Sequence, residues 1–321
     1  KKEIIDTLVV KENSATVYQL TDSDGKPHGS YNYLFLALGT PSYQDFYNLQ
    51  GLKNYIHNPY PVVEKLNHIN KETRVAIIGS GLTAFDLVNY LSHEKDLKYP
   101  MGIFTIIPYF NSLRVPPYQG PALEYSLDKN WIEKERHKNK GVIPLNRMVK
   151  VIGKDLKANH IDLAAIREKY DPTDLKGTYR TYFGQDHPEL SKLQGYIALL
   201  SGNLGDLYMS LSRKDQARYH SDYAAIFSHY QVRLAPDAVS NMYQLMTQDQ
   251  LFIEPDLMEI KKHENFMLKS ASGKSYQADV VINASGFDFN TDRIGDDNPL
   301  LKRLLDKGFL LDKDKRGLLV T

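Results

Sequence analysis

A glycine-rich turn carries the clearest chemical signal in the sequence. Its six residues match the G-x-G-x-x-G/A pattern of a phosphate-binding turn, and they are Gly79, Ser80, Gly81, Leu82, Thr83 and Ala84. Gly79 permits a tight turn, Gly81 lets the backbone approach a pyrophosphate without a Cβ in the way, and Ala84 lets a helix pack closely on a strand. The free N–H groups at the start of that helix attract phosphate. The pattern therefore predicts that these residues bind the pyrophosphate of a dinucleotide.

The segments on both sides of the turn fit this interpretation. Residues 75–78 form a short apolar, β-branched run, as expected for a strand that is buried on both faces. After the turn, apolar residues recur at helical spacing, at Ala84, Leu87, Val88 and Leu91. Residues 102–107 then supply a second strand. The sequence thus predicts the strand–turn–helix–strand unit that the motif requires, against the alternative of a turn that binds no phosphate.

The choice of nicotinamide cofactor depends on the residues at the end of the second strand. An NAD site usually has an acid there, which binds the ribose 2′-hydroxyl. Here the strand ends at residues 108–110 without an acid, and Glu94 and Asp96 come earlier, between helix and strand. Arg114 comes a few residues later and is a candidate for binding a 2′-phosphate. We therefore predict NADP(H) rather than NAD(H), although Arg114 could equally be a solvated loop cation.

Composition limits the classes of function. With 321 residues and 42% hydrophobic content, the chain suits two globular domains, or one domain with a large insertion. A formal net charge of +1 argues against nucleic acid or an anionic membrane as a partner. No apolar run approaches the roughly 18 residues of a transmembrane helix. The absence of cysteine fits a reducing cytoplasm, and the scattered histidines show no metal-binding spacing. The predicted partner is a small-molecule substrate, and no metal site is predicted.

Two further strands end in small residues. Residues 1–41 resemble antiparallel sheet, and their last predicted strand, 31–38, ends at Gly39 and Thr40. A second strand begins near residue 279 and ends at Ser285 and Gly286. Small residues at strand ends let the backbone approach a ligand, so these four residues are candidate cofactor contacts. The alternative is that both glycines only turn the chain.

The middle of the chain, residues 146–250, reads as mainly helical. Aromatic-rich segments at 213–229 and 237–246 indicate helices that bury one face in a core rather than form a binding site. Tyr219, His220 and Arg233 are candidate substrate contacts beside these helices, against the alternative of surface or fully hydrogen-bonded helix residues. No residue is assigned a catalytic proton transfer.

The order of these segments resembles that of flavoproteins with two dinucleotide-binding domains, in which an NAD(P)H domain interrupts an FAD domain. Flavin-dependent and N-hydroxylating monooxygenases of this group end such strands in Ala-Thr-Gly, where this chain has Ala-Leu-Gly at 37–39 and Ala-Ser-Gly at 284–286. The chain is more similar still to a bacterial FAD/NAD(P)-binding oxidoreductase family. That similarity lies in residues 79–86 and in Arg-Leu-Ala-Pro at 233–236.

The resemblance implies an α/β fold: a Rossmann-like NAD(P)-binding domain with a large, mainly helical insertion, flanked by β-rich remnants of an FAD-binding domain. We expect the FAD remnant at 1–45, the NAD(P) domain at 46–115, the insertion at 116–250, and return strands with the start of the FAD remainder at 251–321. The family's N-terminal G-x-G-x-x-G does not occur in residues 1–41. We therefore expect a fragment that binds FAD poorly, with FAD held by the full-length protein.

The function implied by the resemblance is hydride transfer from NAD(P)H to FAD and then to an unknown small substrate or O₂. The cofactors would carry the chemistry, and the protein would position them. Two alternatives stay open. A nicotinamide-only dehydrogenase predicts a six-stranded parallel sheet, and a non-catalytic nucleotide-binding module predicts binding without turnover.

Overall fold

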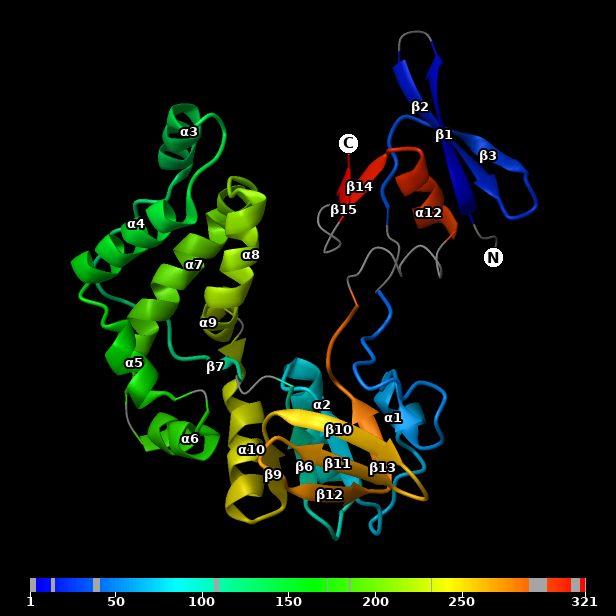
Figure 1. Cartoon of the computed structure of the whole chain (residues 1–321), viewed down its shortest axis with the longest axis vertical. Helices are drawn as coiled ribbons and strands as arrows, with labels where there is room; N and C mark the ends of the chain where they lie inside the picture. Colours follow the sequence, from blue (N-terminus) through cyan, green and yellow to red (C-terminus); the bar gives the residue numbers. More distant parts are fainter. Residues whose placement is uncertain are drawn as a thin grey trace. The chain divides into compact units, whose positions relative to one another are not determined.

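The computed structural model describes residues 4–12, 15–36, 41–106, 110–171, 173–184, 186–231, 233–288, 299–312 and 318–320. The chain divides into two compact units, one of residues 47–284 and one of residues 1–46 with 285–321. Figure 1 shows the elements of each unit along the chain. The larger unit holds a parallel sheet and most of the helices, so the predicted α/β fold class is confirmed.

The centre of the larger unit is a five-stranded sheet in which every neighbouring pair is parallel. Its order is β4 (Tyr55–Ile56), β13 (Val280–Asn283), β5 (Val75–Ile78), β6 (Met101–Phe104) and β9 (Leu251–Glu254). Strand β5 lies where the sequence predicts it. Strand β6 ends at Phe104, earlier than the predicted residue 107, which lies outside the described residues.

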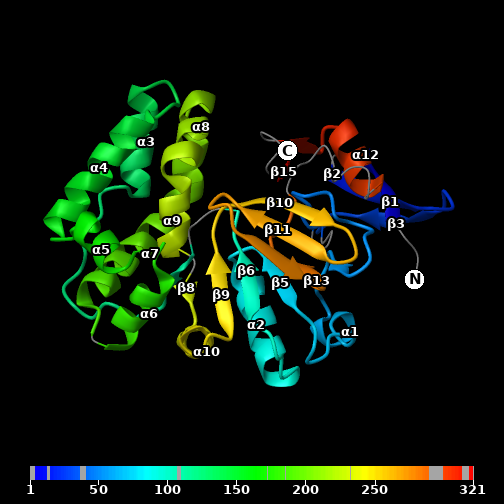
Figure 2. The same cartoon turned by 60° about the horizontal axis from the view of Figure 1, so that its bottom comes forward.

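The two faces of this sheet are covered by different elements. On one face, Val75 and Ile77 pack with the helices α2 (Leu82–Glu94) and α10 (Pro236–Thr247). On the other, Ala76 and Ile78 pack against an antiparallel meander of β10 (Leu257–Lys262), β11 (Phe266–Ser270) and β12 (Ser275–Ala278). Successive side chains of a strand point to opposite faces, which explains the fully apolar run at 75–78. Figure 2 shows α2, the parallel strands and the meander together.

The meander is the connection from β9 to β13, so a three-stranded sheet stands where a helix usually joins parallel strands. Strands β11 and β12 confirm sequence predictions. Strand β10 escapes prediction because Met258, Glu259 and Lys261 interrupt its two buried residues, Leu257 and Ile260.

Residues 129–231 are mainly helical and cover most of the helical region predicted at 146–250, which also contains α10. They contain α3 (Lys129–Lys138), α4 (Leu145–Ala158), α5 (Leu163–Lys169), α6 (Leu175–Gly184), α7 (Pro188–Met209), α8 (Arg213–Asp222) and α9 (Ala224–Gln231). The segment predicted as one helix from 213 is two, which separate at Tyr223. Short parallel strands β7 (Ser112–Leu113) and β8 (Arg233–Leu234) flank this region, and α1 (Val62–Lys65) precedes β5.

The smaller unit is built on an antiparallel sheet of β1 (Ile4–Glu12), β2 (Ala15–Asp22) and β3 (Pro27–Tyr31). Helix α12 (Pro299–Asp306) packs on β1, and β14 (Leu310–Asp312) pairs with β15 (Leu318–Val320). The predicted strand over 31–38 is wrong in its described part, because β3 ends at Tyr31 and residues 32–36 form no strand. Tyr33 and Phe35 are 82% and 91% exposed, so burial does not favour extended pairing there.

Candidate functional site

The glycine turn lies at the point where the order of the parallel sheet reverses. From β5 the chain passes through α2 to β6 on one side, whereas β13 pairs with β5 on the other. The carboxyl ends of these two strands adjoin, because the Ala284 N–H donates a hydrogen bond of 2.7 Å to the carbonyl of Ile78. Open α/β sheets bind ligands at such a switch point. Residues 79–84 therefore lie at the switch point of this sheet.

The backbone of the turn has the form that phosphate binding needs. Gly79 has a φ of +121°, a conformation that favours glycine, and its N–H donates to the Phe104 carbonyl at 2.9 Å. Gly81 is the N-cap of α2, and no side chain caps the helix there. A Cβ added at Gly81 would meet no atom within 4 Å. The start of α2 is thus open to a ligand as well as polar.

The other residues of the turn divide into inner and outer positions. Ala84 is fully buried against the sheet, which lets α2 approach β5 closely. Leu82 is 51% exposed, and Ser80 and Thr83 are half-buried. The first turn of α2 contains no acidic residue, so no side-chain charge there would oppose a phosphate.

The structure also shows where the acidic residues that could bind a ribose hydroxyl lie in the sheet. Glu94 ends α2 and Asp96 comes just after it, and from there the chain enters the amino end of β6, at the edge opposite the glycine turn. Glu254, which the sequence reasoning missed, ends β9 and pairs with Phe104 in the sheet. It therefore lies at the carboxyl edge, beside the end of β6, where a ribose-binding acid is expected.

Glu254 is buried and its oxygens are already in use. It accepts hydrogen bonds from the Tyr276 hydroxyl at 2.5 Å and the Ser272 hydroxyl at 2.9 Å, and it pairs with Lys274 at 3.4 Å. Burial raises the pKa of Glu254, but these hydrogen bonds outweigh it and hold the pKa below its usual value. Glu254 therefore fastens the meander and is not available to a ribose. Glu254 can be recognised as a candidate only from the pairing of β6 with β9 and from the burial of its side chain. Neither is visible in the sequence.

Arg114 and Arg233, which the sequence assigns to different roles, lie side by side. Strands β7 and β8 pair in parallel, and the Arg114 N–H donates to the Leu234 carbonyl at 2.9 Å. Both arginines line one pocket of about 560 Å³, whose other walls come from α7 and from residues 115–123. The structure thus joins a predicted cofactor contact and a predicted substrate contact in one place.

Tyr219 and His220 belong to the helical core instead. The His220 Nε2 lies 3.0 Å from the Tyr208 hydroxyl, and the rings of Tyr208 and Tyr219 meet edge to face. Burial raises the pKa of Tyr219. Tyr219 also lines an apolar cavity of about 250 Å³ between α4, α7, α8 and α9. Neither residue lines the pocket of Arg114 and Arg233.

The remaining candidates belong to the smaller unit. Gly39 and Thr40 lie outside the described residues. Gly286 has a φ of +93°, and its carbonyl accepts a hydrogen bond of 3.0 Å from the Gln44 N–H. The Ser285 hydroxyl is 3.5 Å from the Gln44 carbonyl, and the rings of Tyr43 and Phe287 pack at 4.8 Å. Ser285 and Gly286 therefore join two distant segments, and a cofactor contact there stays a prediction.

Two classes of feature are missing from the described part of the chain. It contains no group of three or more acidic or histidine side chains arranged to hold a metal ion. Among the same residues, no helix combines the length and apolar character needed to cross a membrane.

No protein-family model matches the sequence, and neither does any curated protein. Among solved structures, the chain is similar to L-lysine 6-monooxygenase from Pseudomonas syringae, with 12% identity, a TM-score of 0.47, and coverage of 99% of this chain and 58% of that one. It is also similar to FAD-bound DfoA, a cadaverine monooxygenase from Erwinia amylovora, with 11% identity, a TM-score of 0.44, and coverage of 98% and 57%. The chain thus spans somewhat more than half the length of these proteins.

Proposed function

We propose that this chain binds NADP(H) through residues 79–84 and belongs to a flavin-dependent NAD(P)H oxidoreductase. The observation that carries the proposal is the glycine turn at the sheet's switch point. There, a glycine-only backbone conformation at Gly79, an open face at Gly81 and an uncapped helix start converge. These are the features by which a backbone binds a pyrophosphate.

Each residue of the turn has a separate part in holding the cofactor. Gly81 admits the pyrophosphate, the first N–H groups of α2 donate to it, and Ala84 keeps α2 on the sheet. The bound nicotinamide would supply a hydride, which FAD in the full-length protein would accept and pass to a small substrate or to O₂. In this proposal the chain binds and orients, and no side chain is assigned a proton.

NADP(H) is favoured over NAD(H) because the described carboxyl edge offers no free acid. Strand β6 is followed by Thr105, whose buried hydroxyl has no hydrogen-bond partner among the described residues. Glu254 is committed to the meander, and Glu94 and Asp96 lie at the other edge. An acid that reads the 2′-hydroxyl is the usual mark of an NAD site.

The architecture bears on the nicotinamide-only alternative. That alternative predicts a six-stranded parallel sheet, whereas the described residues form a five-stranded one, with a meander as the last crossover. The larger unit, residues 47–284, also stands in the sequence between the two segments of the smaller unit, as expected of a nicotinamide domain that interrupts a flavin domain.

The nicotinamide site is tested by titrating NADP⁺ into the native chain and a Gly81→Glu variant. We expect binding to weaken more than tenfold, because the new carboxylate would occupy the open face and repel phosphate. A matched control is Gly153→Glu in α4, where an added Cβ also meets no atom within 4 Å. Equal binding by the native chain and Gly81→Glu, with both folded, would refute this placement of the pyrophosphate.

The flavin part of the proposal needs the full-length protein. We expect its purified form to be yellow and its flavin absorbance to bleach when NADPH is added without O₂. A full-length preparation without flavin, which also takes none up from solution, would rule out this part. The NADP⁺ site could still hold, since the two experiments are independent.

A further inference from the structure

The pocket at β7 and β8 has the features of a second ligand site. Its volume of about 560 Å³ lies in the usual range of small-molecule pockets, roughly 300–1,000 Å³. It is walled by α7 on one side and by the segment from Arg114 to Leu123 on the other. The glycine turn is not among the residues that line it.

Arg233 enters this pocket with unused hydrogen-bonding capacity. Its Nη2 donates to the Gln194 carbonyl at 3.0 Å, whereas its Nε is buried and has no partner among the described residues. Burial lowers the pKa of Arg233, and the positive charge of Arg114 lowers it further. Burying an incompletely paired guanidinium is costly, so a ligand that accepts its hydrogen bonds would be favoured.

Arg114 supplies a second guanidinium to the same pocket. It is exposed, and only its backbone is held, through the Leu234 carbonyl and the Tyr182 hydroxyl, which donates to the Arg114 carbonyl at 2.6 Å. Within the described ranges, no carboxylate forms an ion pair with either arginine. Two neighbouring like charges without a counter-ion attract an anion.

Apart from Ser191 and Gln194, the other side chains that line the pocket are mostly apolar. Tyr118 and Leu123 form one wall, and Ala198 and Leu199 project from α7 on the other. Gly195 lets these walls approach, because an added Cβ would come within 3.2 Å of Leu123. A ligand that fits has one anionic end and a flat or branched apolar body.

We propose that this pocket binds a small organic acid, with its carboxylate at Arg114 and Arg233 and its apolar body between Tyr118 and α7. Planar guanidinium groups match a carboxylate with paired hydrogen bonds, and the pocket extends well past the arginines to hold the carbon skeleton. The site is separate from the dinucleotide turn, so this proposal can fail while the proposed function holds.

Benzoate is a suitable probe, with the neutral benzamide as its counterpart. Calorimetric titration should show that the native chain binds benzoate at least tenfold more tightly than benzamide. Arg114→Gln should remove that preference without unfolding the chain, because only the Arg114 backbone is held by neighbouring residues in the described structure. Arg233→Gln should act likewise, and Ala198→Phe should weaken both probes by filling the pocket. Arg180→Gln, an exposed arginine on α6, is the matched control and should change nothing.

The same variants separate a carboxylate site from a phosphate site. If Arg114→Gln weakens NADP⁺ but leaves NAD⁺ and benzoate binding unchanged, the arginines serve the 2′-phosphate and the proposal is overturned. It is also overturned if the native chain binds no benzoate, or binds benzamide equally well. Loss of benzoate binding in both arginine variants, with NADP⁺ affinity unchanged, supports it.

Discussion

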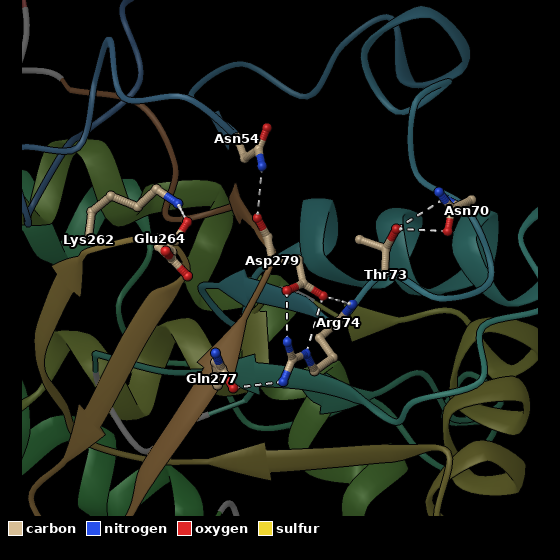
Figure 3. Close-up of polar contacts among 8 residues, drawn as sticks. All are labelled: Asn54, Asn70, Thr73, Arg74, Lys262, Glu264, Gln277 and Asp279. Carbon is tan, nitrogen blue, oxygen red and sulfur yellow. Dashed lines mark hydrogen bonds and ion pairs between the residues drawn. The ribbon is translucent and has the colours of Figure 1, made fainter.

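Arg74 and Asp279 face each other at the amino ends of β5 and β13 and bind at three points (Figure 3). The Arg74 Nη2 and Nε donate to the two carboxylate oxygens at 3.0 and 3.2 Å, and the Arg74 backbone N–H donates to Oδ2 at 2.8 Å. The Arg74 Nη1 also donates to Gln277 at 2.7 Å. This pair fixes the register of the two strands whose opposite ends carry the glycine turn and Ala284.

Stability should depend on pH through Asp279. Burial raises the pKa of Asp279, but hydrogen bonds from Arg74 outweigh it and leave the pKa below its ordinary 3.8. A carboxyl with a lowered pKa stabilises the fold above its unfolded pKa, and this contribution is lost as the pH falls below 3.8. Urea midpoints measured between pH 7 and 3 should fall more steeply for the native chain than for Asp279→Asn. The control is Asp249→Asn, and parallel pH profiles for the native chain and Asp279→Asn would contradict the prediction.

The two glycines of the turn should respond differently to the same substitution. Gly79→Ser forces a side chain into a φ of +121° and should destabilise the chain by about 1–3 kcal/mol. Gly81→Ser should be neutral or slightly stabilising, because Gly81 is an N-cap in extended backbone with open space around it, and serine is a good N-cap. Thermal unfolding monitored by circular dichroism measures both. An equal loss in the two variants would mean that backbone conformation is not what selects glycine at position 79.

The hydroxyl of Tyr276 should contribute to stability through Glu254. Tyr276→Phe keeps the ring stack with Phe252 but removes a hydrogen bond to a buried carboxylate. The free energy of unfolding should therefore fall by about 1.5–3 kcal/mol. Burial and the neighbouring Glu254 raise the pKa of Tyr276 to about 12. Burial also raises the pKa of Tyr47, Tyr170 and Tyr230 to about 12, so the variant should lose one tyrosine from the group that titrates late in an alkaline absorbance scan. Tyr33→Phe, at an 82% exposed site, is the control for both measurements. An unchanged number of late-titrating tyrosines in the variant would mean that Tyr276 is not one of them.

Packing between the sheet and the meander should tolerate no extra methyl group at Gly102. A Cβ there would lie 2.6 Å from both Phe104 and Phe252, so Gly102→Ala should destabilise by about 1–3 kcal/mol. Gly202→Ala, inside α7 with no atom within 4 Å, should instead stabilise by about 0.5–1 kcal/mol. Denaturant unfolding distinguishes the two variants, because the free energy of unfolding should fall for Gly102→Ala and rise for Gly202→Ala. A stable Gly102→Ala variant would show that the rings can move aside.

The sequence predicted β5 and α2 because their signals are local. An apolar run, two glycines and a helical repeat of apolar residues all lie within twenty residues of each other, and each is explained by its near neighbours. The predicted strand at 31–38 used the same kind of signal and was wrong in its described part. Apolar residues such as Tyr33 and Phe35 favour a strand only if something covers them, and both are exposed.

The proximity of Arg114 and Arg233 could not be predicted in this way. Strands β7 and β8 have two residues each and lie far apart in the chain, so neither carries a periodic pattern. Their pairing depends on the helices folded between them. Glu254 shows the same limit, since its position beside Phe104 follows from sheet order, which local sequence does not contain.

The edge strand β4 has a consequence for how this protein can be handled. Although β4 comes first in the larger unit and β13 last, the two pair side by side. The Val281 N–H donates to the Asn54 carbonyl, and the Asn283 side-chain amide donates to the His57 carbonyl. Segments near the two ends of residues 47–284 are therefore held together by parallel strand pairing, and the other strands of the sheet lie between these segments in the sequence. Such a segment is a cassette: it should survive excision, grafting into a surface loop of another host, or circular permutation with a short linker across its ends.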